Sequence, residues 1–171
     1  MILDRIARVW ARVLELGAMA LMMGLVGVIT WSVLGRQVLH ITVPWSEEMG
    51  AGMLAWMVML GSGAAWYHRG HLVIDLVLRR LAQRALYVCT VGIELMSLLL
   101  LAVAFAGSLS MMSVSAHNST TALGISYSYL YLALVIGLGS MIVFSLLYLR
   151  RLAVEGLAAL PRYDGDSEWN T

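Results

Sequence analysis

The sequence predicts an all-α membrane protein with four transmembrane helices. Three observations carry this prediction: 61% of the 171 residues are hydrophobic, only 12% are charged, and the apolar residues gather in four long stretches. A soluble domain is usually about 45–50% apolar and about 25% charged. The composition therefore excludes a water-soluble globule. We expect a single membrane domain over residues 1–171, ending in a flexible tail over residues 161–171.

Each predicted span is long enough to cross the hydrocarbon core of a bilayer, which takes about 20 mostly apolar residues. The four spans cover residues 16–35, 49–67, 85–108 and 122–149. The fourth is long enough to tilt or to project beyond the bilayer.

The arginines predict the orientation, because short cytoplasmic loops carry the excess of positive charge. The chain has eleven arginines and no lysine, and Arg36 alone falls on one side of the predicted spans. The other ten fall on the opposite side: Arg5, Arg8, Arg12, Arg69, Arg79, Arg80, Arg84, Arg150, Arg151 and Arg162. Both termini are therefore expected in the cytoplasm. The first apolar run exceeds the core of a signal peptide, about 7–15 residues, so we expect it to remain as an anchor.

The residues before the first span have the pattern of an amphipathic helix. Arg5, Arg8, Arg12 and Glu15 share one helical face, and apolar residues occupy the other. This pattern predicts a helix lying at the membrane surface. An equally good interpretation is that these residues extend the first span into the cytoplasm.

A second surface helix is predicted over residues 71–84, between the second and third spans. Its apolar residues line one face, whereas its arginines spread over the other. Arg79, Arg80 and Arg84 are expected to lie against lipid phosphates, each attraction being worth about 1 kcal/mol.

Glu94 is the only ionisable residue well inside a predicted span. Such a residue suggests a functional site, here for a proton or a cation. The alternative is structural: a carboxyl group hydrogen-bonded to a neighbouring helix or to a partner subunit. The structural interpretation is favoured because the spans contain no second acid or base that could complete a proton relay.

The first loop ends in Pro44-Trp-Ser46-Glu47-Glu48, a pattern typical of a helix start. Ser46 is expected to cap the helix, and the two carboxylates favour the positive end of its dipole. Together with Arg36 at the end of the first span, the acids could instead form a buried salt bridge between helices or a contact with a partner. Trp56, in the middle of the second span, is expected to pack against another helix or a partner.

Small residues recur at a spacing of four, which allows close helix packing in lipid. The pairs are Ala51/Ala55, Gly61/Ala65, Ala102/Ala106 and Ala133/Gly137. Spacing alone does not tell which of these pairs lie where two helices meet.

Cofactor and enzyme functions are not indicated. The four histidines, His40, His68, His71 and His117, lie at span ends or in loops on both sides of the membrane, which disfavours a haem held between two of them. Cys89 is the only cysteine, so a cysteine-built metal site is excluded. We expect no metal, no cofactor, no catalytic residue and no nucleic-acid partner.

A series of residues around the second span points to a known family. It runs Pro44-Trp-Ser-Glu47-Glu48-Met-Gly-Ala-Gly-Met-Leu-Ala-Trp56 and continues with His68-Arg-Gly70-His71-Leu-Val-Ile-Asp75. Arg36 before it and Thr120-Thr-Ala-Leu-Gly124 after it complete the pattern. In this order the series resembles the small membrane subunit of tripartite ATP-independent periplasmic (TRAP) transporters.

The resemblance implies a scaffold in a bacterial inner membrane. It would pair, one to one, with a separate large subunit that moves a carboxylate-type solute by a sodium-driven elevator motion, and a periplasmic binding protein would deliver the solute. Seven residues are then candidates for subunit contacts or structural polar contacts: Arg36, Glu47, Glu48, Trp56, His71, Asp75 and Glu94. The alternative is a stand-alone proton-coupled transporter, working as a homodimer through Glu94.

Overall fold

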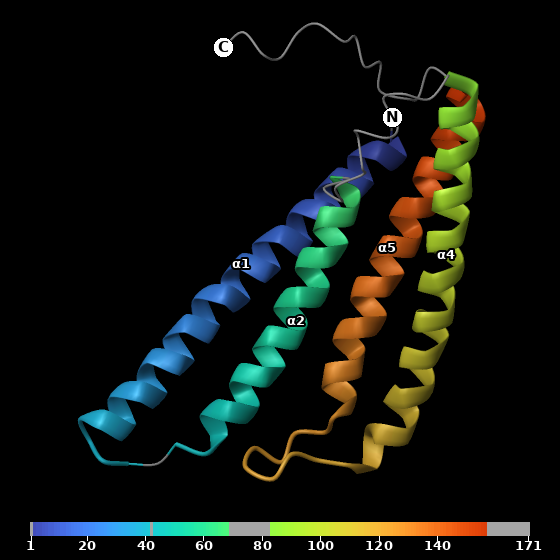
Figure 1. The fold of residues 1–171 in the computed structure, drawn as a ribbon. Helices are drawn as coiled ribbons and strands as arrows, with labels where there is room; N and C mark the ends of the chain where they lie inside the picture. The colour runs from blue at the N-terminus through green and yellow to red at the C-terminus, as the bar shows by residue number, and fades with distance from the viewer. Residues whose placement is uncertain (1, 42, 69–82, 157–171) are drawn as a thin grey trace, which may run out of the picture.

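The structure, a computed structural model, describes residues 2–41, 43–68 and 83–156 (Figure 1). Its elements are α1 (Ile2–Gln37), α2 (Trp45–Tyr67), α4 (Gln83–Val114), the short 3-10 helix η1 (Ser115–His117) and α5 (Ser128–Glu155). The predicted surface helix over residues 71–84 lies almost entirely outside the described residues, as do His71, Asp75, Arg79, Arg80 and the tail over residues 161–171. Arg84 falls in the first turn of α4, but its side chain is also outside the description.

The long helices lie side by side in the order α1, α2, α5, α4 (Figure 1). One end of the bundle holds the start of α1 and the end of α5, and with them Arg5, Arg8, Arg12, Arg150 and Arg151; we call it the arginine end. The other end holds the connections from α1 to α2 and from α4 to α5, and we call it the loop end (Figure 1).

Four helices in the described part are long and apolar enough to cross a membrane, which confirms the prediction of four spans. They differ in how much the chain buries them: 33% of the apolar window of α5 is buried, against 6% to 11% in the other three. The helix α5 is therefore the central one. The others leave most of their apolar surface for lipid or a partner.

The core is small and lies near the arginine end. Ala7, Ala11 and Leu14 of α1 meet Ala64 of α2 and Phe144 of α5 in one buried cluster. A second contact joins Leu86 of α4 to Leu152 of α5. The small side chains let the helices approach closely, as is usual for packing in lipid.

The first helix is unbroken from Ile2 to Gln37, so the N-terminal residues extend the first span and do not form a separate helix. Ala7 and Ala11 are buried in the bundle, whereas Val9 and Val13 are exposed. The arginine pattern at the start of the chain thus belongs to a helix that packs against α2 and α5 through its small residues.

The last helix begins at Ser128, later than the predicted boundary at residue 122. Gly124 has a φ of +65°, and the Thr120 amide donates to the Ile125 carbonyl at 2.9 Å. This turn is incompatible with a helix, although its residues are apolar enough to read as the start of a span. The sequence-based boundary was wrong because hydropathy does not detect a turn.

Candidate functional site

The Glu48 carboxylate joins α2 to the α4–α5 connection at the loop end. Its Oε1 accepts hydrogen bonds from the Thr121 hydroxyl and the Ala122 amide, and its Oε2 accepts one from the Leu123 amide, all at 2.9 Å. Hydrogen bonds to an ionised carboxylate are stronger than those between neutral groups. We call this set of contacts the Glu48 clamp.

The connection that Glu48 holds is itself ordered by hydrogen bonds. Ser119 and Ser126 form an isolated antiparallel bridge, and the Tyr127 amide donates to the Asn118 carbonyl at 3.0 Å. The Ser126 hydroxyl lies within hydrogen-bonding distance of the Ser115 carbonyl in η1. The α4–α5 connection is therefore a compact turn with a fixed position on α2.

Arg36 and Glu47 form the predicted pair, but at the surface. Their charged atoms lie 3.7 Å apart, and the two side chains are 65% and 81% exposed. A pair this exposed contributes about 0–1 kcal/mol. The expectation of a buried salt bridge is wrong for these two residues, although both are accessible to a partner.

Ser46 does not cap α2, contrary to the prediction. The helix begins at Trp45 with Pro44 in the cap position, and no side chain caps it. The buried Ser46 hydroxyl donates to the Val43 carbonyl at 2.7 Å and lies 2.9 Å from the Ser32 hydroxyl of α1. Pro44 has a φ of −62°, close to helical, so the helix starts before Ser46 is reached.

An open groove of about 380 Å³ lies beside the Glu48 clamp. Both Glu48 and Trp56 line it, so the structure brings two predicted residues to one place. The remaining lining is mostly apolar and comes from α1, α2, α5 and the α4–α5 connection: Leu21, Met49, Gly52, Met53, Thr120, Leu123, Ile125, Ser126, Tyr129 and Leu130. We call it the Trp56 groove.

Two tryptophans tie α1 and α2 to α5 nearer the arginine end. Trp10 donates its indole N–H to the Ser140 hydroxyl at 3.0 Å, and Trp66 donates to the Ser145 hydroxyl at 2.8 Å. Both serines are buried. Each tryptophan thus gives a buried hydroxyl a partner in a region where water is scarce.

A hydrogen bond and an ion pair join the same helices at the arginine end. His68, at the end of α2, meets the Glu15 carboxylate of α1. Arg151 of α5 meets Asp4 of α1 at 2.8 Å. None of Asp4, Glu15, His68 and Arg151 was among the candidates from the sequence, because their partners lie far away along the chain.

Glu94 is buried by other residues of this chain, with 5% of its surface exposed. Along α4, Glu94 lies between two contacts with α5. In the first, the Tyr87 hydroxyl donates to the Leu152 carbonyl. In the second, the Phe105 ring lies close to Gly139. A partner subunit would not reach this carboxylate from the outer surface of the bundle. Among the described residues, no group of three metal-ligating side chains could hold a metal ion.

Comparison with known proteins adds one finding. The family model for tripartite ATP-independent periplasmic transporters, DctQ component, matches residues 25–155. This range contains the Glu48 clamp, Glu94 and all the lining residues of the Trp56 groove except Leu21. No curated protein matches the chain.

Proposed function

Because this chain belongs to the DctQ component family of tripartite ATP-independent periplasmic transporters, we propose that it is the static scaffold of the large membrane subunit. In an elevator mechanism, one domain translates against another that stays in place. The part that stays in place must hold its own helices together under load.

The observation that carries this proposal is a set of contacts that join α2 to the α4–α5 connection at the loop end and α1 and α2 to α5 near the arginine end. The Glu48 clamp fixes the loop end. The two Trp–Ser hydrogen bonds, the His68–Glu15 hydrogen bond and the Asp4–Arg151 ion pair fix the arginine end. A bundle tied in this way resists sliding of one helix past its neighbour. Such resistance suits a frame, which must keep its shape while another domain moves against it.

A disulfide between α2 and α5 tests the static role directly. A Cβ atom built on Gly63 would lie 3.6 Å from the Ser140 Cβ, and disulfides span about 3.5–4.5 Å between Cβ atoms. The variant Gly63→Cys/Ser140→Cys is made with Cys89→Ser, which removes the exposed native thiol. The complex with its large subunit is reconstituted in vesicles, and uptake is compared before and after oxidation.

We expect the oxidised double-cysteine variant to transport as fast as the reduced one. Each single-cysteine variant, treated with the same oxidant, controls for damage elsewhere. Loss of uptake on oxidation of the double variant alone, reversed by a reductant, would show that α2 moves against α5 and would refute the scaffold role.

The large subunit is proposed to dock on the Trp56 groove. The groove is apolar, it is open, and it contains a large aromatic side chain, the residue type that dominates interface energies. Trp56→Ala is expected to lower co-purification of the large subunit about tenfold or more, the usual effect of removing an interface hot spot. Trp31→Ala, at an exposed position of α1 outside the groove, is the matched control and is expected to change nothing.

The ends of the bundle are proposed to face different compartments. The arginine end, and so both termini, would face the cytoplasm of a bacterial cell, since positive charge accumulates there. The loop end would then face the periplasm, where the exposed Arg36–Glu47 pair could meet a solute-binding protein. Charge reversal at Arg36 is expected to slow uptake when the binding protein is limiting, and not when it is in excess.

The transported solute is proposed to be a carboxylate, taken up with sodium, as in the family that the chain resembles. Uptake by the reconstituted complex should stop when sodium is replaced by potassium. In the same vesicles, uptake by the Glu94→Gln variant distinguishes the scaffold hypothesis from that of a stand-alone proton-coupled transporter. The scaffold predicts unchanged uptake, whereas a coupling role for Glu94 predicts its loss.

A further inference from the structure

Three arginines share one face of α1 at the arginine end. Arg5, Arg8 and Arg12 follow one another at spacings of three and four residues, so they are neighbours on the helix surface. All three are exposed, whereas Ala7 and Ala11 on the opposite side of the helix are buried against α2 and α5. The three arginines therefore point away from the bundle, and we call them the arginine stripe.

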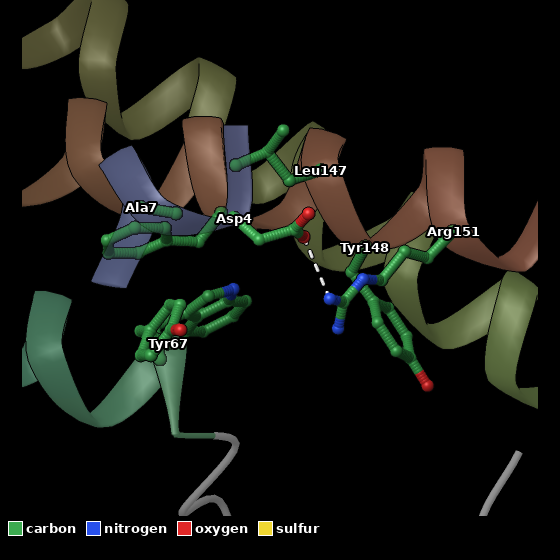
Figure 2. A pocket seen from close by; sticks show the side chains of 8 residues that line it. Asp4, Ala7, Tyr67, Leu147, Tyr148 and Arg151 are labelled. Atoms are coloured by element: carbon green, nitrogen blue, oxygen red, sulfur yellow. Dashed lines mark hydrogen bonds and ion pairs between the residues drawn. The ribbon is translucent and has the colours of Figure 1, made fainter. Parts of the chain in front are cut away.

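The two acidic residues of α1 bond to other helices and not to the arginine stripe. Asp4 lies 2.8 Å from Arg151 of α5, and Figure 2 shows these two side chains pointing toward each other. Glu15 meets His68 of α2. Among the residues that the structure describes, none forms a hydrogen bond or an ion pair with a side chain of the arginine stripe. The stripe thus presents three guanidinium groups that this part of the chain does not pair.

Exposed apolar side chains continue the arginine stripe toward the loop end. Leu16, Met19 and Met23 follow Arg12 at the same spacings of three and four residues, so they lie on the same face of α1. They are 64%, 61% and 77% exposed, on a helix that is apolar enough to cross a membrane. We call these three side chains the apolar track. One face of one helix therefore joins a cationic end to an apolar surface at membrane depth.

A phospholipid with a net negative charge has the same two parts in the same order. Guanidinium groups bind phosphate through paired N–H donors, and acyl chains cover the apolar side chains that follow. A zwitterionic headgroup fits less well, because it brings a cation of its own that the arginines repel. An acidic protein segment at the membrane surface would pair the arginines but would not reach the apolar track. The two surfaces together therefore favour an anionic lipid.

The charge and length of the arginine stripe favour a lipid with two phosphate groups. A helix rises 1.5 Å per residue, so Arg5 and Arg12 start about 10 Å apart along α1. A lipid with one phosphate leaves two of the three guanidinium charges unpaired, whereas a lipid with two phosphates leaves only one. Two phosphates joined by a short linker can also contact both ends of the stripe at once.

We propose that the outer face of α1 binds a phospholipid with two phosphate groups, such as diphosphatidylglycerol. The phosphates pair with the guanidinium groups of the arginine stripe, and acyl chains lie along the apolar track. The contacts that tie α1 to α2 and α5 stay intact, because the lipid uses neither Asp4 nor Glu15. A lipid bound in this way holds α1 at a fixed depth in the membrane.

Native mass spectrometry of the full-length chain in detergent measures how tightly each lipid is retained. Diphosphatidylglycerol also has more acyl chains than phosphatidylglycerol, so the ratio of their affinities is compared between the wild type and the variant Arg5→Gln/Arg8→Gln/Arg12→Gln. We expect this ratio to be about fivefold higher in the wild type, the effect of one additional contact between an arginine and a negative charge. An equal ratio in both proteins would overturn the proposal and leave the arginines to an acidic protein surface.

Single variants assign the binding to the arginine stripe. Arg8→Gln, in the middle of the stripe, should weaken retention of diphosphatidylglycerol about fivefold. Arg150→Gln removes the same charge from an exposed position of α5 at the same end of the bundle, and it should leave retention unchanged. Both side chains are exposed, so neither variant opens the core. If the two variants weaken retention equally, the lipid responds to the total charge of the arginine end and the proposal fails.

Inorganic phosphate separates a lipid site from a site for a free anion. Ionic strength is kept constant with sodium chloride, because salt screens exposed charges. We expect phosphate to displace diphosphatidylglycerol only at concentrations at least about a hundredfold above that of the lipid, since it lacks the apolar contacts of the acyl chains. Displacement by phosphate at the concentration of the lipid would contradict a lipid site.

Discussion

At Gly137 the backbone of α5 lies close to that of α2. A Cβ atom at this position would lie 2.8 Å from the Met59 carbonyl oxygen and 3.0 Å from the Met59 Cβ. Non-bonded carbon atoms prefer about 3.5–4.0 Å. Gly137→Ala must therefore push the two helices apart by about 0.5–1 Å, because a helical backbone carbonyl cannot rotate away.

The expected loss of stability follows from two opposing effects. Overpacking a tight contact costs about 1–3 kcal/mol, while Gly→Ala inside a helix gains up to about 1 kcal/mol. Gly92→Ala on α4 provides the gain alone, since nothing lies within 4 Å of a Cβ built there. The difference between the two variants isolates the steric cost of about 1–3 kcal/mol.

Thermal unfolding in detergent, followed by tryptophan fluorescence, measures this difference. For a chain of this size, 1 kcal/mol shifts the melting temperature by about 2–4 °C. Gly137→Ala should thus melt about 2–12 °C below Gly92→Ala. Equal melting temperatures would mean that α2 and α5 are not in close contact at Gly137, and the helix order described above would be wrong.

Two further predictions concern the side chains that tie the helices together. Glu48→Ala should raise hydrogen exchange at the amides of residues 122 and 123 about 10–100-fold, because each loses a hydrogen bond to a charged group. The control is Glu47→Ala, since the Glu47 side chain is 81% exposed. Similar exchange at these amides in both variants would exclude the clamp. Trp66→Phe and Ser145→Ala should each destabilise the protein, and the double variant should lose about 0.5–2 kcal/mol less than the sum of the two. A strictly additive double variant would show that the 2.8 Å contact between them contributes nothing.

The number and type of the membrane-spanning helices follow from the hydropathy along the sequence. Four apolar stretches of sufficient length can satisfy their backbone hydrogen bonds in lipid only as helices here, and hydropathy detects such stretches well. Hydropathy does not detect where a helix stops when the next residues are also apolar. The turn at Gly124 was therefore missed, whereas the continuity of α1 through its arginine-rich start was one of the two interpretations that the sequence left open.

The site was predictable only in part. Glu48 and Trp56 were recognisable as unusual residues at or within a span, and the structure places both on one groove. Their partners were not recognisable, since Glu48 bonds residues 73 to 75 positions away along the chain. Backbone amides, which carry most of this contact, have no signature in a sequence.

The sequence by itself determined that the chain has four stretches long and apolar enough to cross a membrane, and it predicts ten of its eleven arginines on one side. Only the tertiary structure decided which small residues lie at contacts between helices. Ala102 and Ala106 have the same spacing as Ala133 and Gly137, yet the first pair is exposed and the second is buried between helices. A spacing of four puts two residues on one face of a helix, but which face meets another helix depends on contacts between distant segments.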